Sequence, residues 1–301
     1  MWTRTSSPST CLSSPHAPVF CDSRADTINI DENRIERLIT PRTRALVLVH
    51  YAGVACELEV ITEICRRKGI ALIEDLAHGP FAAHRGRPLG TFGAMATLSF
   101  HQTKNFSYGE GGALLLNDAR YLERAEIIRE KGTNRARFFR GEVDKYTWVD
   151  QGSSYLLSDL LAALLLGGLE ARDEIQRHRL SLWNLYLDGL QDDCRRCGVG
   201  VPAVPEGVSH SAHIFPLVME SLEQRQDFIR FMTRHGIQCS FHYQSLHDTP
   251  MGLTFPGQPD DCPVARGLSD QLVRLPLWHG LQPAQAKRVI SAVAAFLGVE
   301  R

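Results

Sequence analysis

The amino-acid sequence predicts an α/β fold in which a mostly parallel central sheet is followed by a smaller α/β domain. Three observations support this prediction. From residue 44 onwards, apolar runs of strand length alternate with amphipathic helical segments. Near residues 198–205, glycine and proline separate a long helical region from a second set of strands and helices. The length of 301 residues suits two unequal domains, which we expect at 18–190 and 191–301.

The first elements form a β-α-β unit. Residues 44–50 and 70–75 are continuous apolar runs, and between them residues 57–69 place apolar side chains on one helical face before a glycine. A unit of this kind implies that its two strands are parallel. The other expected elements are strands at 93–100, 112–117, 214–219 and 237–243, and helices at 118–131, 222–235 and 283–297.

Three segments have a distinct composition. Residues 132–154 are polar, aromatic and basic, and a connection of that length is usually functional or disordered. The longest apolar run, residues 156–169, is interrupted by polar residues and is too short for a membrane span, so we expect a buried helix that is capped by Ser158. Residues 1–17 are rich in Ser, Thr and Pro and contain no acidic residue, so we expect them to be either disordered or foreign to the fold that follows.

The composition is that of a soluble globular protein, with 44% hydrophobic and 22% charged residues. A net charge of -1 gives no field for gathering nucleic acid or anionic lipid, so neither partner is expected, and no membrane insertion is expected either. The eight cysteines are scattered, which favours the cytoplasm as the location. Cys194 and Cys197 form a single C-x-x-C within a charged stretch, which we interpret as a solvated helix end and not as a zinc or redox site.

Polar residues follow two of the expected strands. Asp75 and His78 follow the strand at 70–75, and His101 and Lys104 follow the strand at 93–100. In open α/β sheets ligands bind beyond the carboxyl ends of the parallel strands, so these residues are expected at a site. From spacing alone, an acid and a lysine at neighbouring strand ends are equally well explained by a structural ion pair.

The residues around Lys104 favour a binding site. Ser99 and Thr103 are compact hydrogen-bond donors suited to a phosphate group, and the glycines at 109, 111 and 112 permit close backbone approach. This glycine cluster precedes a strand and does not open a helix, so it is not a dinucleotide-binding fingerprint.

Three successive motifs then carry a resemblance to a known family. The stretches "EDLAH" (74–78), "LSFHQTKN" (98–105) and "GEGGALLLND" (109–118) resemble the motifs of the DegT/DnrJ/EryC1/StrS sugar aminotransferases. These enzymes depend on pyridoxal 5'-phosphate (PLP) and have fold type I, the aspartate aminotransferase-like architecture. The similarity runs from about Val19 to the carboxyl terminus. More narrowly, "VHYAGVACE" (49–57), "REKGTNRARFFRGEVDKYTWVDQGSSY" (129–155) and "FHYQSLH" (241–247) resemble the members that make TDP-4-amino-4,6-dideoxygalactose for enterobacterial common antigen.

The resemblance implies roles for four residues. Lys104 is the lysine that bonds to the cofactor aldehyde and then serves as base, for which its amine must be neutral. Asp75 is the carboxylate that pairs with the pyridinium nitrogen. His78 lies beside the ring, although a core histidine is the alternative for this residue, and Ser99 contacts the phosphate.

The resemblance also implies the reaction and the assembly. An amino group would pass from glutamate to the C4 ketone of a TDP-linked 4-keto-6-deoxy sugar, at an active site on the interface of a homodimer. Arg135 in the basic loop is a candidate for substrate contact, although a solvated charged loop explains this segment equally well. His242 and His247 are further candidates, and His101 serves either in packing or in substrate contact. Residues 152–156, Gly-Ser-Ser-Tyr-Leu, depart from the family pattern for the segment that reaches the neighbouring subunit's phosphate.

The family members carry a phosphate-binding helix terminus and a ring-stacking aromatic before the part equivalent to Val19. We do not find this part in the sequence, so we expect that the amino-terminal part of the fold is missing and that the large domain is incomplete. The alternative to an active enzyme is therefore a truncated, non-catalytic remnant, or a partner of a full-length subunit.

Overall fold

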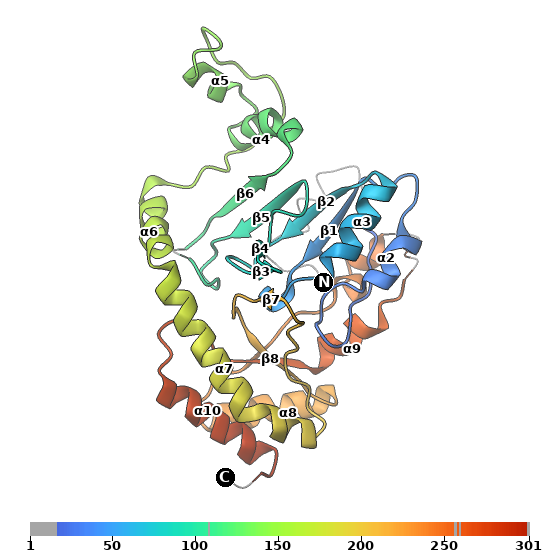
Figure 1. The fold of residues 1–301 in the computed structure, drawn as a ribbon, viewed down its shortest axis with the longest axis vertical. Coiled ribbons are helices and arrows are strands. Elements are labelled where there is room, and N and C mark those ends of the chain that lie inside the picture. Colours follow the sequence, from blue (N-terminus) through green and yellow to red (C-terminus); the bar gives the residue numbers. More distant parts are fainter. Residues whose placement is uncertain (1–16, 108, 256–257, 259, 300–301) are drawn as a thin grey trace.

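The computed structural model of the chain describes residues 17–107, 109–255, 258 and 260–299. Figure 1 shows a central sheet, a lower part built from α7, α8 and α10 around a second sheet, and an arm that carries α4 and α5 away from the body. For residues 1–17 the sequence predicts either disorder or a segment foreign to the fold. Residues 1–16 of this segment lie outside the described residues.

The central sheet confirms the predicted α/β class. Its strand order is β1-β2-β5-β6, with β1, β2 and β5 parallel and β6 antiparallel to β5. The strands span β1 (Ala45–Val49), β2 (Ala71–Asp75), β5 (Met95–Ser99) and β6 (Gly112–Leu116). The crossover helix α3 (Leu58–Lys68) buries one apolar face and ends at Gly69, whose φ of 66° is a left-handed conformation suited to glycine. Helix α2 (Glu32–Leu38), which the sequence analysis did not predict, lies beside α3 (Figure 1).

The strand register aligns the carboxyl ends of the three parallel strands. Val49 pairs with Asp75, and Asp75 pairs with Thr97. The loops that follow β1, β2 and β5 therefore leave the sheet at the same edge, as expected for a ligand site in an open sheet. The loop after β1 begins with the short 3-10 helix η1 (Tyr51–Gly53).

The carboxyl-terminal part is built on an antiparallel sheet of order β8-β10-β9. Its elements are α7 (Arg172–Arg196), β8 (Phe215–Val218), α8 (Leu222–Arg234), β9 (Ser240–Phe241), α9 (Pro263–Gln271), β10 (Leu272–Leu275) and α10 (Pro283–Phe296), with η3 (Leu246–Asp248) and η4 (Gly252–Thr254) in the long connection. The strand predicted at 237–243 is shorter than expected, and α9 and β10 were not predicted.

Helix α7 spans the domain boundary that the sequence analysis placed at residue 190. Side chains on both sides of that position, including Leu182, Tyr186 and Cys194, share one core with residues of β8, β10 and α10. The interpretation of the C-x-x-C as a solvated helix end is wrong for Cys194, because this residue is fully buried on the inner face of the helix.

Among the connections between the sheet region and the carboxyl-terminal part are two structures that each involve several residues. The first is a small sheet of order β4-β3-β7, made from β3 (Ala83–His84), β4 (Arg87–Pro88) and β7 (Val208–Ser209). Because β7 leads into the second half of the chain, its pairing with β3 joins the two parts.

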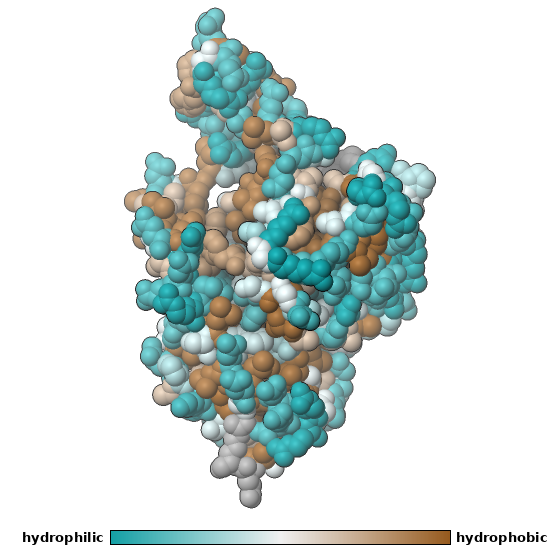
Figure 2. Space-filling view, viewed as in Figure 1, coloured by the Kyte–Doolittle hydropathy of each residue, from teal (hydrophilic) through white to brown (hydrophobic). Residues whose placement is uncertain are grey.

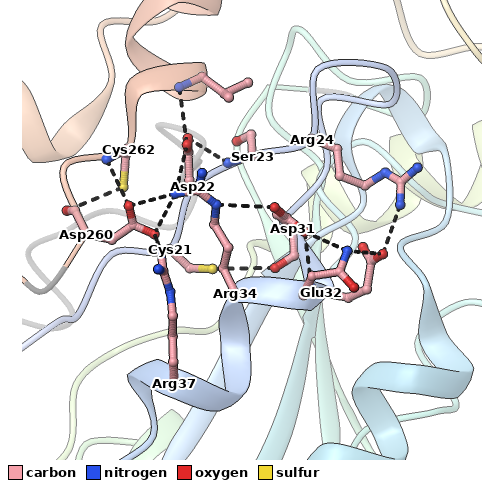
Figure 3. Close-up of polar contacts among 12 residues, drawn as sticks. Cys21, Asp22, Ser23, Arg24, Asp31, Glu32, Arg34, Arg37, Asp260 and Cys262 are labelled. Carbon is pink, nitrogen blue, oxygen red and sulfur yellow. Dashed lines mark hydrogen bonds and ion pairs between the residues drawn. The ribbon is translucent and has the colours of Figure 1, made fainter.

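The second connection is a buried ionic network, shown in Figure 3. Asp260 pairs with Arg34 and Arg37 of α2, at 2.9 Å in each case. Asp22 accepts hydrogen bonds from the backbone N–H groups of Val264 and Ala265 at the start of α9, at 3.2 and 2.8 Å. Both carboxylates are almost fully buried, so the removal of either one would leave charges or amide groups without partners.

The arm contains η2 (Ala119–Tyr121), α4 (Leu122–Arg129) and α5 (Arg135–Phe139), and the chain returns through α6 (Asp159–Glu170). The predicted loop 132–154 thus includes a short helix. Figure 2 shows apolar surface on the arm and beside α6.

The expected buried helix at 156–169 is wrong for the isolated chain, because Leu160, Leu164 and Leu166 are 81%, 55% and 57% exposed. None of the helices in the described part of the chain is long and apolar enough to cross a membrane.

Candidate active site

The structure brings Lys104, Asp75 and His78 together at the carboxyl edge of the sheet. Asp75 is the last residue of β2, and Lys104 lies in the turn after β5, where its N–H donates to the carbonyl of His101 at 2.8 Å. The side chains are buried, with 9% exposure for Lys104, 2% for Asp75 and 3% for His78. A lysine that is buried to this degree requires a specific environment.

The electrostatics of Lys104 suit a reactive amine. Burial lowers the pKa of Lys104 to about 8, because the charged form loses hydration. The Asp75 carboxylate opposes this shift by raising the pKa, and the Arg274 guanidinium adds to it. A sizeable fraction of the amine is therefore neutral at mildly alkaline pH, whereas an exposed lysine remains protonated.

The position of His78 is fixed by the loop after β1. Its Nδ1 accepts a hydrogen bond from the Ala52 N–H at 3.3 Å. Burial lowers the pKa of His78 well below its usual value, and the nearby Lys104 charge lowers it further. His78 is therefore neutral with its proton on Nε2, and this N–H has no hydrogen-bond partner among the described residues.

A cluster of buried rings surrounds His78. Its imidazole stacks on that of His213, with centroids 4.2 Å apart and an interplanar angle of 26°. Tyr51 meets His78 edge-on at 5.8 Å and stacks on His242 at 5.7 Å. The Tyr51 hydroxyl lies 2.6 Å from His242 Nε2, while His242 Nδ1 is buried with no partner among the described residues.

Arg274 is a cation that the sequence analysis missed. In β10 it lies on the same face as Leu272, which packs in one cluster with Tyr51 and Ala52, while Val273 and Leu275 point into the opposite core. The guanidinium has neither a hydrogen bond nor an ion pair within the described part of the chain. Its charge lowers the pKa of His242, after the effect of burial, to about 3. The sequence feature that could have identified Arg274 is a single arginine within a short apolar run.

The other predicted residues have different surroundings. Ser99 ends β5 at the same edge of the sheet, where its Oγ lies 3.4 Å from the His101 N–H. The His101 ring lies 2.9 Å from Thr103 Oγ1 and 3.5 Å from the Glu110 carboxylate, and it is not part of the ring cluster. These two residues therefore lie beside the Lys104 turn.

The structure does not bring Arg135 or His247 to Lys104 of the same chain. Arg135 is the first residue of α5, which lies on the arm (Figure 1), and its guanidinium pairs with Glu130 at 2.6 Å. His247 is held by Ser245 at 2.8 Å and faces Asp248 at 3.3 Å. The roles of these two residues in substrate binding stay predictions.

Comparison with known proteins decides the family. The sequence profile described as the DegT/DnrJ/EryC1/StrS aminotransferase family matches residues 3–294. The chain belongs to this family. The match includes most of the amino-terminal segment that the sequence analysis had set apart as unlike the family. Membership in the DegT/DnrJ/EryC1/StrS family confirms the expected aminotransferase class and the fold type I architecture.

Individual relatives of this aminotransferase agree with the assignment. The dTDP-3-amino-3,4,6-trideoxy-alpha-D-glucose transaminase of Streptomyces venezuelae is 30% identical over 92% of this chain and 69% of its own length. The EryC1 protein of Saccharopolyspora erythraea is 30% identical over 92% of this chain and 72% of its own length. The crystal structure of DesV from S. venezuelae in complex with a ketimine intermediate superposes with a TM-score of 0.87 at 28% identity, and covers 99% of this chain and 77% of that one.

The residues at the carboxyl edge of the sheet fit the PLP that this family uses. They offer a buried amine of lowered pKa at Lys104, a buried carboxylate at Asp75 and, at His78, an N–H donor with no partner within the described ranges. An aldehyde, a protonated ring nitrogen and a ring substituent are the respective partners of these groups in a PLP site.

Proposed function

We propose that this chain transfers an amino group from glutamate to the C4 ketone of a TDP-linked 4-keto-6-deoxy sugar, with PLP as cofactor. The observation that carries the proposal is the burial of Lys104 beside Asp75. Burial lowers the pKa of Lys104 to about 8, and Asp75 supplies the carboxylate that the ring nitrogen of PLP needs. A purely structural ion pair would raise the lysine pKa, because an opposite charge favours the protonated form.

Each residue has a defined task in this proposal. PLP, when bound, supplies an aldehyde that bonds to amines and a cationic ring that withdraws electrons from the neighbouring carbon. Lys104 anchors this aldehyde and then moves a proton with its neutral Nζ. Asp75 accepts a hydrogen bond from the ring nitrogen and so keeps it protonated. His78 donates its Nε2–H from beside the ring, and Ser99 binds the phosphate.

Arg274 supports an acidic amino donor. A guanidinium that has no partner in the described part of the chain, at the edge of a buried site, is costly unless it meets an anion, and a carboxylate matches its planar fork of donors. Its charge lowers the pKa of both Lys104 and His242, so the guanidinium lies close to the amine with which the amino donor would exchange. Glutamate, with two carboxylates, satisfies this requirement.

The nucleotide sugar is proposed from the relatives and from the narrower resemblance. The relative from S. venezuelae is named as a transaminase of a dTDP-linked amino sugar, which supports this class of substrate. The choice of C4 rests on the segments 49–57, 129–155 and 241–247. His101, His242 and His247 are the candidates for contact with the sugar from the same chain.

We also propose that the protein acts as a homodimer in the cytoplasm. The exposed leucines of α6 would be buried by packing against another apolar surface, and a second copy of the chain would provide an equivalent helix. In such a dimer the arm could carry Arg135 to the nucleotide in the partner's site, whereas in its own chain Arg135 pairs with Glu130 in the arm.

Absorbance spectroscopy tests the proposal. We expect the purified chain to bind PLP with a visible band that disappears on addition of glutamate and returns when TDP-4-keto-6-deoxyglucose is added. A sugar ketone at C3 is the control for the position of amination. If the chain binds no PLP at all, the alternative of a non-catalytic remnant or partner subunit is favoured.

A further inference from the structure

The segment Ser211–His213 crosses the carboxyl ends of all three parallel strands. It leads into β8 and contacts the loop after β1 at Gly53, the loop after β2 at His78 and the turn after β5 at Asn105. All three of its residues are buried. A single short segment therefore connects the loops that carry the candidate catalytic groups.

The contact with the lysine turn is made by the residue next to Lys104. The Asn105 amide donates from Nδ2 to the Ser211 carbonyl at 2.8 Å, and its Oδ1 lies 2.8 Å from His213 Nδ1. Because the amide oxygen can only accept, His213 Nδ1 carries the proton and donates it to Asn105. Both ends of the amide are thus held, and the backbone of the lysine turn is held with them.

The contact with the His78 loop has two parts. The Ser211 hydroxyl donates to the His78 carbonyl, and the His213 ring stacks on the His78 ring. A Cβ atom at Gly53 would overlap the Ser211 side chain and lie 2.7 Å from the His78 carbonyl oxygen, so the β1 loop fits closely against the same point. Burial lowers the pKa of His213 well below its usual value, so the stacked pair of imidazoles stays neutral.

This arrangement is more specific than core packing requires. Aliphatic side chains would fill the same volume without burying two imidazoles and an amide, and buried polar groups are costly unless each one is satisfied. Here the hydrogen bonds of the Asn105 amide, the Ser211 hydroxyl and His213 Nδ1 are made, and they join the residue after Lys104 to the backbone of His78.

We propose that Asn105, Ser211 and His213 form a clamp of positioning residues that sets the place of Lys104 relative to His78. The clamp proposal rests on the proposed function, in which Lys104 moves a proton beside the cofactor ring and His78 contacts that ring. Its residues act through their neighbours, so they affect the rate of the proton transfer more than the binding of either substrate. A displacement of about 1 Å at a reacting group can cost on the order of 10²-fold in rate.

Two substitutions at His213 separate the parts of the clamp. His213→Phe keeps the stacked ring and removes the donor to Asn105, whereas His213→Asn keeps a donor near the position of Nδ1 and removes the ring. We expect kcat to fall by roughly 10²-fold in His213→Phe, with KM for glutamate within about threefold of the parent. We expect His213→Asn to recover part of this loss in kcat. His178→Phe, which removes a partly buried imidazole from α7 away from the clamp, is the control.

Nitrogen-15 NMR of the histidines in the parent protein without PLP is an independent test, because it does not require that a variant folds. The clamp predicts that His213 carries its proton on Nδ1 and that His78 carries it on Nε2. The opposite tautomer at His213, an unchanged kcat in His213→Phe, or a rise in KM alone would each overturn the proposal. If the parent chain failed to bind PLP, the proposed function would fail while the tautomers still tested the clamp.

Discussion

Tyr51 Oη lies 2.6 Å from His242 Nε2, and this hydrogen bond joins the loop after β1 to the end of β9. The two rings also stack, with an interplanar angle of 24°. Both residues are buried, and burial raises the pKa of Tyr51 and lowers that of His242, so the pair is neutral. The carboxyl-terminal part therefore contributes a buried polar wall to a site whose other groups come from the central sheet.

Removal of the Tyr51 hydroxyl tests the cost of this contact. Tyr51→Phe leaves both ring nitrogens of His242 buried without partners, because Nδ1 already has none among the described residues. We expect the free energy of unfolding to fall by about 1–3 kcal/mol in urea titrations. Tyr155→Phe removes a hydroxyl from a side chain that is 64% exposed, and we expect no measurable change there. Equal effects in the two variants would contradict the role of the contact.

The rate at which PLP reacts with the unloaded protein depends on the neutral fraction of Lys104. Its pKa is lowered to about 8, so we expect the rate constant to rise between pH 7 and 9 and to level off above that. An exposed lysine would continue to gain reactivity up to its usual pKa of about 10.4. Stopped-flow absorbance across this pH range gives the midpoint, and a midpoint near 10 would show that burial does not control the amine.

Substitutions at the two neighbouring charges shift that midpoint in opposite directions. Asp75 raises the pKa of Lys104, so Asp75→Asn lowers the midpoint. Arg274 lowers the pKa of Lys104, so Arg274→Gln raises the midpoint. Arg230→Gln removes the same charge from an exposed position on α8 and leaves the midpoint unchanged. Shifts in the same direction for Asp75→Asn and Arg274→Gln would contradict the electrostatic account.

Glu74 links the stability of the sheet to acid pH. Its buried carboxylate accepts N–H bonds from Gly90, Phe92 and Gly93 at 2.7–2.8 Å and lies 3.1 Å from His50 Nε2. Burial alone would raise the pKa of Glu74, but His50 and these N–H donors outweigh it, and the pKa is lowered. The contribution of Glu74 to stability is therefore complete above its unfolded pKa and is lost as the pH falls through the lowered folded value.

Glu74→Gln should remove this acid dependence. We expect the variant to lose on the order of 3 kcal/mol of unfolding free energy at pH 7, with a smaller difference from the parent at pH 4. Glu63→Gln, at a side chain that is 52% exposed on α3, should change stability by less than about 0.5 kcal/mol. A loss that is independent of pH would show that shape, and not charge, accounts for the effect.

The exposed leucines of α6 predict an apolar dimer contact. Leu160 and Leu164 are four residues apart and lie on one helical face. We expect the double variant Leu160→Glu, Leu164→Glu to sediment as a monomer where the parent sediments as a dimer. Leu253→Glu places the same charge on a leucine that is 72% exposed in η4 and should not change the sedimentation. A parent chain that is monomeric at micromolar concentration would refute the contact.

The sequence was sufficient to predict the frame of the site. The strands β1, β2 and β5 are short apolar runs, and their parallel pairing places Asp75 and Lys104 at one edge whatever the details of the loops. Contacts between residues that are far apart in the chain could not be predicted from the sequence. His213 and Asn105 are 108 positions apart and His242 and Tyr51 are 191 apart, and no local pattern reports on such pairs.

Local partners explain why other histidines are not in the ring cluster. His101 bonds to Thr103 and His247 bonds to Ser245, each two residues away, and these short-range bonds compete with longer contacts. The exposure of α6 was missed for a different reason. An apolar helix has the same sequence pattern whether its own chain or a second copy covers it.

Chemical trapping tests the central claim most directly. The purified protein is incubated with PLP, reduced with borohydride and digested, and the modified lysine is located by mass spectrometry. We predict that the stable adduct lies on Lys104 and that Lys104→Ala shows neither the adduct nor the visible band. An adduct on another lysine, together with transamination that survives in Lys104→Ala, would contradict the account.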